Sequence, residues 1–190
     1  MRGKSHLCLG IYLAEKYMPQ TSPACIRAFL LGCIQPDRNP LTYLKGSIRH
    51  QWMRGHNYPN ACKYISRLSV RLENKEKFTI LDYYSLGKLI HYTVDAFTLA
   101  HNTNFPEDLA QHRIYETALQ HYFLIALRND PNTEILSAAT VAEIICIYHQ
   151  EYSCQIPGIC NDTLYALNAS CSILAHIFEK QNTLSNGVLI

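Results

Sequence analysis

Residues 91–101 read HYTVDAFTLAH, a mostly apolar stretch that carries two histidines and one carboxylate. His91 and Asp95 are four residues apart, so a helix places their side chains on one face, a single turn from each other. His101 follows six residues after Asp95, which is off the helical repeat, and we expect it at or beyond the end of this helix. The stretch therefore predicts a helix with a polar pair set into an apolar surface.

A second pair of the same kind occurs at residues 112–116, which read HRIYE. His112 and Glu116 are again four residues apart. The intervening residues 102–106 read NTNFP, which supplies turn residues and a proline suited to the start of a helix. Because two helices joined by a short turn run antiparallel, the sequence predicts that both pairs face one spot.

Five ionisable side chains within 26 residues of apolar helical sequence need partners. A buried carboxylate without a partner is strongly unfavourable. Imidazole nitrogens and carboxylate oxygens are ordinary ligands for zinc, and they also suit other divalent metals. Ordinary charged contacts between the histidines and the carboxylates are the alternative interpretation. The pattern favours a metal site.

The rest of the chain has the periodicity of helices and no pattern typical of a strand. We expect Asp37 in a loop directly after the second helix, and Asp82 as the cap of the helix that carries His91. The remaining expected helices cover residues 5–17, 24–33, 61–72, 134–152 and 161–180. The predicted fold is all-α, a single-domain multi-helix bundle over residues 1–180 with a loose tail at 181–190.

Composition limits the function further. The 190 residues are 48% apolar and 17% charged, which is enough apolar sequence for a sizeable core. The net charge of +2 is close to neutral and argues against a stable nucleic-acid partner. Eight cysteines are scattered without a Cys-x-x-Cys pair, so we expect reduced and mostly buried thiols.

The sequence also suggests a compartment. The first residues, MRGKSH, are polar, and the apolar run that follows is too short for a secretory signal. No apolar run approaches the length of a transmembrane segment. We therefore expect a cytoplasmic protein without a membrane span.

Taken in chain order, these histidines and carboxylates resemble the ligand series of the zinc-dependent phospholipase C family, which is related to the tri-zinc single-strand nucleases. The spacing His91-x-x-x-Asp95 followed by His101 is the most specific part. The resemblance covers roughly the first 120 residues. The matching positions are His6, Asp37, a loop histidine (His50 or His56), His91, Asp95, His101, His112 and Glu116.

The resemblance implies two or three zinc ions. The first would be held by Asp37, a loop histidine, His91 and Asp95. The second would be held by His101, His112 and Glu116. The third would be held by His6, by a bridging Asp95 and by the backbone of the N-terminal residue.

Two positions of this series need comment. Secreted members of the family expose a tryptophan at the mature N-terminus, whereas this sequence begins with Met1, whose amine would have to take that place. For the loop histidine we favour His56, because the adjacent Gly55 lets the backbone turn the ring inward, and His50 is the alternative.

The resemblance also implies hydrolysis of a phosphate ester by metal-activated water. Asp37 is the candidate catalytic residue that orients or deprotonates this water. Arg38 and Arg54 are candidates for phosphate contact, because guanidinium groups fit phosphate oxygens. We expect a phospholipid or another phosphodiester as substrate. The alternatives are a nuclease or nucleotidase on the same metal core, and a metal-binding helical protein without turnover.

Overall fold

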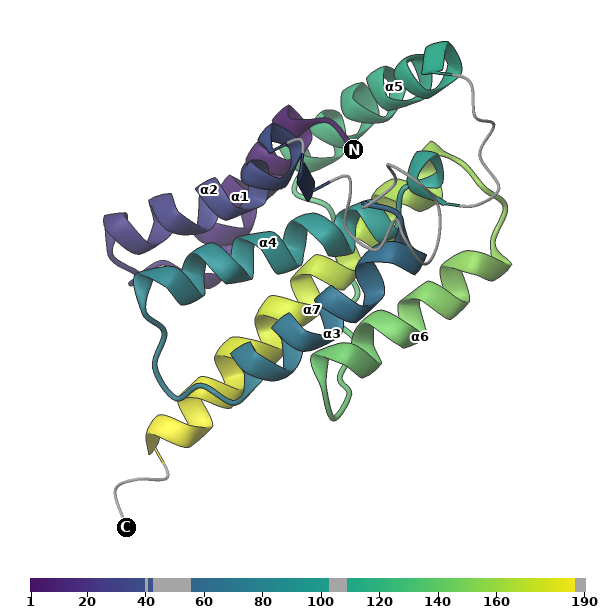
Figure 1. Cartoon of the computed structure of the whole chain (residues 1–190). Helices are drawn as coiled ribbons and strands as arrows, with labels where there is room; N and C mark the ends of the chain where they lie inside the picture. Colours follow the sequence, from purple (N-terminus) through teal and green to yellow (C-terminus); the bar gives the residue numbers. More distant parts are fainter. Residues whose placement is uncertain (40, 43–55, 103–108, 187–190) are drawn as a thin grey trace.

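The computed structural model describes residues 1–39, 41–42, 56–102 and 109–186 (Figure 1). These residues form seven α-helices and short 3-10 segments, with no strand among them, which confirms the all-α prediction. The elements are α1 (Gly3–Tyr17), α2 (Pro23–Arg38), α3 (Tyr58–Glu73), α4 (Ile80–Ala96), the 3-10 turn η2 (Leu99–His101), α5 (Leu109–Arg128), α6 (Val141–Cys154) and α7 (Ile159–Asn186).

Helix α4 lies at the centre of the bundle, with α2, α3 and α7 packed around it (Figure 1). Every residue from Leu89 to Ala96 is buried, as expected for a helix that is covered on all sides. Its first turn is held by a capping box in which Thr79 is the N-cap and the Asp82 carboxylate accepts the Thr79 backbone N–H. The prediction that Asp82 is the cap was therefore wrong: the N-cap is Thr79, and Asp82 lies in the first turn of the helix.

Two glycines allow α2 to approach α4 closely. A Cβ on Gly32 would collide with the backbone oxygen of Tyr84, and a Cβ on Gly87 would collide with the backbone oxygen of Phe29. Only glycine fits such a contact between two helix backbones. Gly32 therefore marks a helix crossing and not the end of the second helix.

Because of this packing, α2 is longer than the sequence predicts. It continues through Pro36, and Asp37 lies in its last turn instead of in a loop. A proline near a helix end removes one backbone hydrogen bond, and the packing of α2 on α4 outweighs this local preference. The carbonyl of Pro36 accepts a 2.6 Å hydrogen bond from Thr42 Oγ1. Asp37 is therefore held by the last turn of a helix and not by a loop.

The C-terminal helices also differ from the predicted ranges. Helix α6 begins at Val141, because the preceding backbone N–H groups bind side chains of α7 instead of forming a helix: Glu134 donates to Asn168 Oδ1 at 3.2 Å, and Leu136 donates to Ser172 Oγ at 2.9 Å. Helix α7 runs on to Asn186, beyond the predicted helix end at residue 180.

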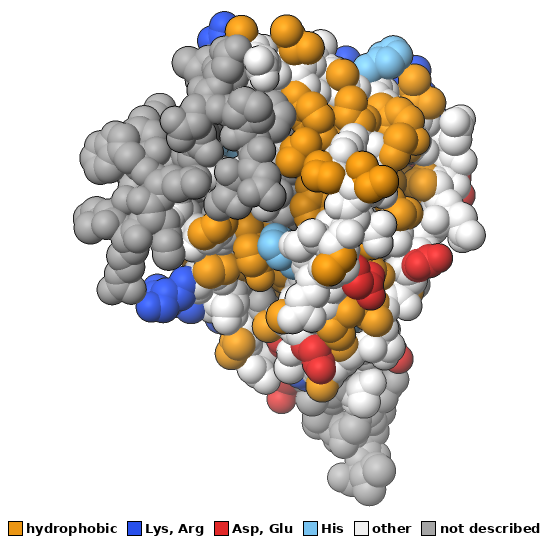
Figure 2. All heavy atoms as spheres, turned by 90° about the vertical axis from the view of Figure 1, so that its right-hand side faces the viewer, with side chains coloured by type: hydrophobic (Ala, Val, Ile, Leu, Met, Phe, Trp, Pro, Cys, Tyr) orange, Lys and Arg blue, Asp and Glu red, His pale blue; other side chains and the backbone are white. Residues whose placement is uncertain are grey.

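Helix α5 packs mainly against α1 and α7 and contributes to the outer surface of the bundle. The predicted turn before it falls largely outside the described residues. Figure 2 shows apolar side chains gathered on the right-hand face of Figure 1. Ile114 on α5 is 70% exposed, and Ile156 between α6 and α7 is 85% exposed. None of the helices in the described ranges has the length and apolar character that a membrane span requires.

All eight cysteines are free thiols, as predicted, but the prediction that most are buried was wrong. Only Cys33 and Cys171 are buried, whereas Cys146, Cys154 and Cys160 are exposed. Cys146 lies in the continuously apolar run IICIY, where neighbouring side chains give no clue to the face that points outward.

Candidate metal centre

Helix α4 places His91 and Asp95 in the interior, both without solvent exposure. His91 Nδ1 lies 2.8 Å from the backbone oxygen of Cys33. A carbonyl oxygen only accepts, so Nδ1 carries the proton and Nε2 is directed toward Asp95 Oδ2, 3.2 Å away. A backbone carbonyl that fixes the histidine tautomer in this way is typical of metal-ligating histidines.

His56 is oriented in the same manner by Thr42. The single hydroxyl proton of Thr42 serves the carbonyl oxygens of Pro36 and Asn39, each at 2.6 Å. Thr42 Oγ1 therefore accepts from His56 Nε2, at 3.0 Å, and His56 Nδ1 faces Asp95 Oδ2 at 2.9 Å. The sequence offered no sign that Thr42 would take this role.

The first ligand group, Asp37, His56, His91 and Asp95, thus brings two carboxylates and two ring nitrogens together. His56 Nδ1 and His91 Nε2 are only 3.2 Å apart. Asp37 Oδ1 lies 3.6 Å from His91 Nε2 and 3.8 Å from His56 Nδ1. His91 Nδ1 and His56 Nε2 already donate hydrogen bonds, so the other nitrogen of each ring is an acceptor. These two nitrogens and the two carboxylates converge, and a bound cation would satisfy all four groups.

The second ligand group consists of His101, His112 and Glu116, whose ligand atoms all lie within 4.8 Å of one another. Glu116 Oε1 is 3.6 Å from Nε2 of both His101 and His112. His112 and Glu116 lie one turn apart on α5, and His101 comes from η2, after α4 has ended. The predicted position of His101 beyond the helix end is confirmed.

Asp95 connects this arrangement to a third set of atoms. Its Oδ1 lies 2.7 Å from the Met1 amine and 3.2 Å from His6 Nε2, while its Oδ2 faces the first group. The Met1 amine is also 2.7 Å from His101 Nε2 and 3.3 Å from Glu116 Oε1. Both oxygens of one buried carboxylate are thereby shared among the three sets.

His6 is the clearest indication of an additional partner. The ring is buried and stacked on His91 at 4.0 Å, and neither of its nitrogens makes a hydrogen bond of normal geometry. Burial and the neighbouring His91 lower the pKa of His6 to about 4, against the opposing effect of Asp95. A buried neutral imidazole with unsatisfied nitrogens is suited to bind a metal.

The charges of the protein groups are strongly coupled. Although burial favours the neutral amine, Asp95 and Glu116 raise the pKa of the Met1 amine to about 10. Burial also opposes ionisation of the two carboxylates, but the Met1 amine and the nearby histidines hold the pKa of Asp95 and that of Glu116 well below their usual values. The carboxylates are therefore negatively charged and suited to a cation.

The structure brings together all eight residues that the sequence singled out for metal binding. Among the loop histidines, His56 lies in the first group, whereas His50 falls outside the described residues. Arg54 also lies outside them, and Arg38 is exposed at the end of α2. The donor set fits zinc, because nitrogen and carboxylate oxygen ligands converge, and the one cation that pairs with Asp95 and Glu116 among the described residues is the Met1 amine.

The family model for zinc-dependent phospholipase C matches residues 5–157, a span that contains all eight of these side chains. The chain belongs to the zinc-dependent phospholipase C family. No curated protein and no solved structure matches the chain. The zinc dependence in the family's description agrees with two clusters whose ligand atoms lie close enough to hold a metal ion: His6, Asp37, His91 and Asp95, and His101, His112 and Glu116.

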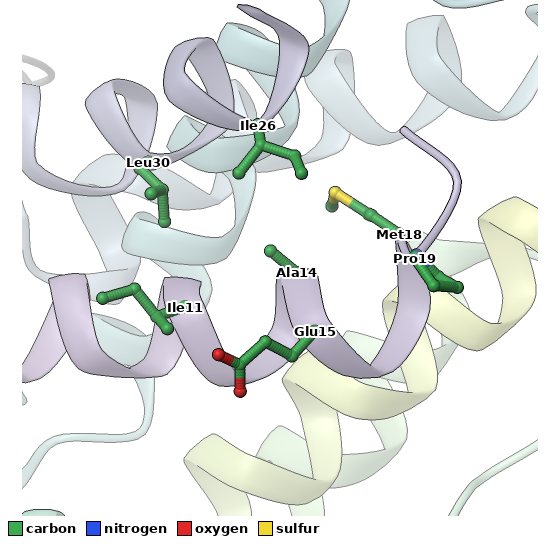
Figure 3. Close-up of a pocket in the computed structure, with 7 residues that line it drawn as sticks. All are labelled: Ile11, Ala14, Glu15, Met18, Pro19, Ile26 and Leu30. Carbon is green, nitrogen blue, oxygen red and sulfur yellow. The ribbon is translucent and has the colours of Figure 1, made fainter. Parts of the chain in front are cut away.

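A hollow between α1 and α2 is distinct from this centre (Figure 3). It encloses about 300 Å³ at the ends of these helices that lie away from His6 and Asp37. Glu15 is the one ionisable residue of its lining, so the hollow offers no metal chemistry. The lining residues are Ile11, Ala14, Glu15, Met18, Pro19, Ile26 and Leu30.

Proposed function

We propose that this family member is a zinc-dependent phosphoric ester hydrolase that cleaves a phospholipid on the glycerol side of its phosphate. The observation that carries the proposal is the gathering of seven histidine and carboxylate side chains into two clusters, with His56 against Asp95 and the two oxygens of Asp95 facing different sets of side chains. Ordinary ion pairing does not require two histidines to turn their remaining nitrogens toward each other at 3.2 Å.

The contacts support a proposal of three ion positions. Asp37, His56, His91 and Asp95 would hold the first ion. His101, His112 and Glu116 would hold the second. His6, Asp95 and the Met1 nitrogen would hold the third, and the unsatisfied ring of His6 supports this assignment. Zinc bound here would lower the pKa of a water molecule and neutralise the charge of the phosphate.

Asp37 is suited to accept the proton of the attacking water. Its side chain is 21% exposed, whereas Asp95 has no exposure, so a proton taken up by Asp37 can pass on to solvent. Asp95 makes close contacts with both its oxygens and serves to hold the ligand sets together. The position of Asp37 in the last turn of α2 keeps the carboxylate in place during this transfer.

The outer surface of α5 supports a lipid substrate. Ile114 lies two residues from both His112 and Glu116, on the opposite side of the helix, and is 70% exposed. An apolar surface on the helix that carries two ligands suits a substrate presented by a lipid aggregate. The net charge of +2 gives no comparable support for a polyanionic nucleic acid.

The test combines metal content with product identity. Purified protein is analysed for zinc and then incubated with phosphatidylcholine vesicles and, separately, with a single-stranded oligonucleotide. We expect two or three zinc equivalents and release of diacylglycerol and phosphocholine, detected by mass spectrometry. Hydrolysis of the oligonucleotide but not of the phospholipid would show that the protein is a nuclease and not a phospholipase. Bound zinc without turnover on either substrate would favour a metal-binding protein without catalysis.

The control variant for this test is Asp37→Asn. We expect it to abolish turnover, because the base and a ligand oxygen of the first group are lost together. The second group, His101, His112 and Glu116, does not involve Asp37, so its zinc is expected to remain. Wild-type turnover by Asp37→Asn would contradict the assigned role of Asp37.

A further inference from the structure

A buried carboxylate outside the two ligand groups, Asp162 in the first turn of α7, accepts three hydrogen bonds. Its Oδ2 accepts from the backbone N–H of Leu99 and from the hydroxyl of Tyr115, each at 2.8 Å. Its Oδ1 accepts from the hydroxyl of Tyr152, also at 2.8 Å. Asp162 is fully buried and lies just beyond the span matched by the family model.

Two of these donors are next to residues of the second ligand group. Leu99 begins the η2 turn that ends at His101, and Tyr115 directly precedes Glu116 on α5. A single oxygen atom, Asp162 Oδ2, therefore links the segment that carries His101 to the helix that carries Glu116.

The link matters because His101 is not held by a long helix. Helix α4 ends at Ala96, and η2 is only three residues long. Asn102 supports one side of this turn through bonds from its Nδ2 to the backbone oxygens of Ala96 and Thr98, at 3.1 and 2.9 Å. Asp162 supports the other side through Leu99. The support comes from the number and direction of these hydrogen bonds, because burial raises the pKa of Asp162 and opposes its ionisation.

We propose that Asp162 is a positioning residue for the second metal site, setting the separation of His101 and Glu116 through Leu99 and Tyr115. The inference rests on the proposed metal-dependent function. Asp162 contributes no ligand atom in this arrangement. Partners that orient ligands in this way change metal affinity by about 10- to 100-fold when they are removed.

The test variant is Asp162→Asn, which keeps the shape of the side chain but removes one acceptor and the charge. We expect the zinc affinity of the second site to fall by about 10- to 100-fold, while the affinity of the first site is unchanged. The affinities are measured by competition with a chelator. Glu116→Gln, which removes a ligand of the second site, identifies the binding step that belongs to it. Faster hydrogen exchange at the Leu99 amide is the readout that does not depend on metal.

The chain offers a matched control in Glu73. This carboxylate is also buried, and its Oε1 accepts from the Val141 backbone N–H and pairs with His176 Nε2, each at 2.9 Å. It joins α3, α6 and α7 without touching either ligand group. We expect Glu73→Gln to lower the stability of the fold and to leave the zinc affinity of the first and second sites unchanged.

The outcomes separate the positioning role from a general effect on folding. Equal zinc affinities in Asp162→Asn and wild type would overturn the positioning role, even if wild-type protein hydrolyses lipid as proposed. Equal losses at the first and the second metal sites would also overturn it, because they would show a structural role only. Should Asp162→Asn fail to fold, Tyr115→Phe removes one donor and is expected to weaken the second site alone. Wild-type protein that takes up no zinc would overturn both proposals.

Discussion

Asp95 is the side chain whose replacement tests the arrangement of the metal centre most directly. Asparagine keeps its shape but removes the charge and one of the two oxygens. In the structure Oδ2 lies 2.9 Å from His56 Nδ1, and Oδ1 lies 2.7 Å from the Met1 amine. An amide has one oxygen, which can face only one of these two sets, and without the negative charge that oxygen is also a poor zinc ligand. We expect Asp95→Asn to lose the first and third ions and to keep the second, at about one zinc per chain.

The size of the effect follows from linkage. At free zinc about 100 times the dissociation constant, each occupied site stabilises the fold by about 2.7 kcal/mol. Loss of two sites should therefore remove about 5 kcal/mol of the zinc-dependent stabilisation. Urea unfolding with and without added zinc measures this difference within each variant. This comparison matters because Asp95→Asn also removes the closest carboxylate partner of the buried Met1 amine and weakens the metal-free fold.

Glu116→Gln provides the complementary result. It should remove the second ion alone and reduce the zinc-dependent stabilisation by about 2.7 kcal/mol. Elemental analysis of both variants distinguishes the two patterns. Zinc content in Asp95→Asn equal to that of wild type would refute the shared-carboxylate arrangement.

Three further predictions concern other parts of the molecule. Two residues added before Met1 convert its buried amine to a peptide group, and we expect zinc content to fall by one equivalent; unchanged content would exclude the amine as a ligand. Gly87→Ala forces a Cβ against the backbone of Phe29 and should destabilise the fold by about 1–3 kcal/mol in urea unfolding, whereas Gly158→Ala, with open space around it, should be neutral. Burial opposes ionisation of Asp82, but hydrogen bonds from Lys75 and Thr79 hold its pKa below the usual 3.8. Ionised Asp82 therefore stabilises the fold above about pH 3.8, and this stabilisation is lost as the pH falls through its lowered pKa. Asp82→Ala should lower the free energy of unfolding by about 1 kcal/mol at pH 7 and by less at pH 3, measured by urea unfolding; equal losses at the two pH values would contradict this.

Local periodicity was sufficient for the parts of the site that lie on helices. A repeat of four residues specifies that His91 and Asp95, or His112 and Glu116, share a face, whatever the helix packs against. The position of His101 beyond the helix end follows from the same repeat. The long apolar run around these residues indicated a buried helix, and α4 is indeed the central helix of the bundle.

The end of α2 shows where such reasoning fails. Gly32 and Pro36 are signals for a helix end, and a sequence window gives no reason to override them. The helix continues because Gly32 and Gly87 let two backbones touch, a contact between residues more than fifty positions apart. The exposure of Cys146 is a similar case, since its apolar neighbours look alike on every side until the packing of α6 is known.

The sequence by itself determined the fold class and the two helical histidine–carboxylate pairs of the candidate site, because these depend on residue type and on the period of the helix. Tertiary structure decided how the ligands are connected. Thr42 and the Cys33 carbonyl set which nitrogen of His56 and His91 faces Asp95, and Asp162 ties the turn of His101 to α5. These partners come from distant segments, and hydrogen-bond direction is defined only once the segments are packed together.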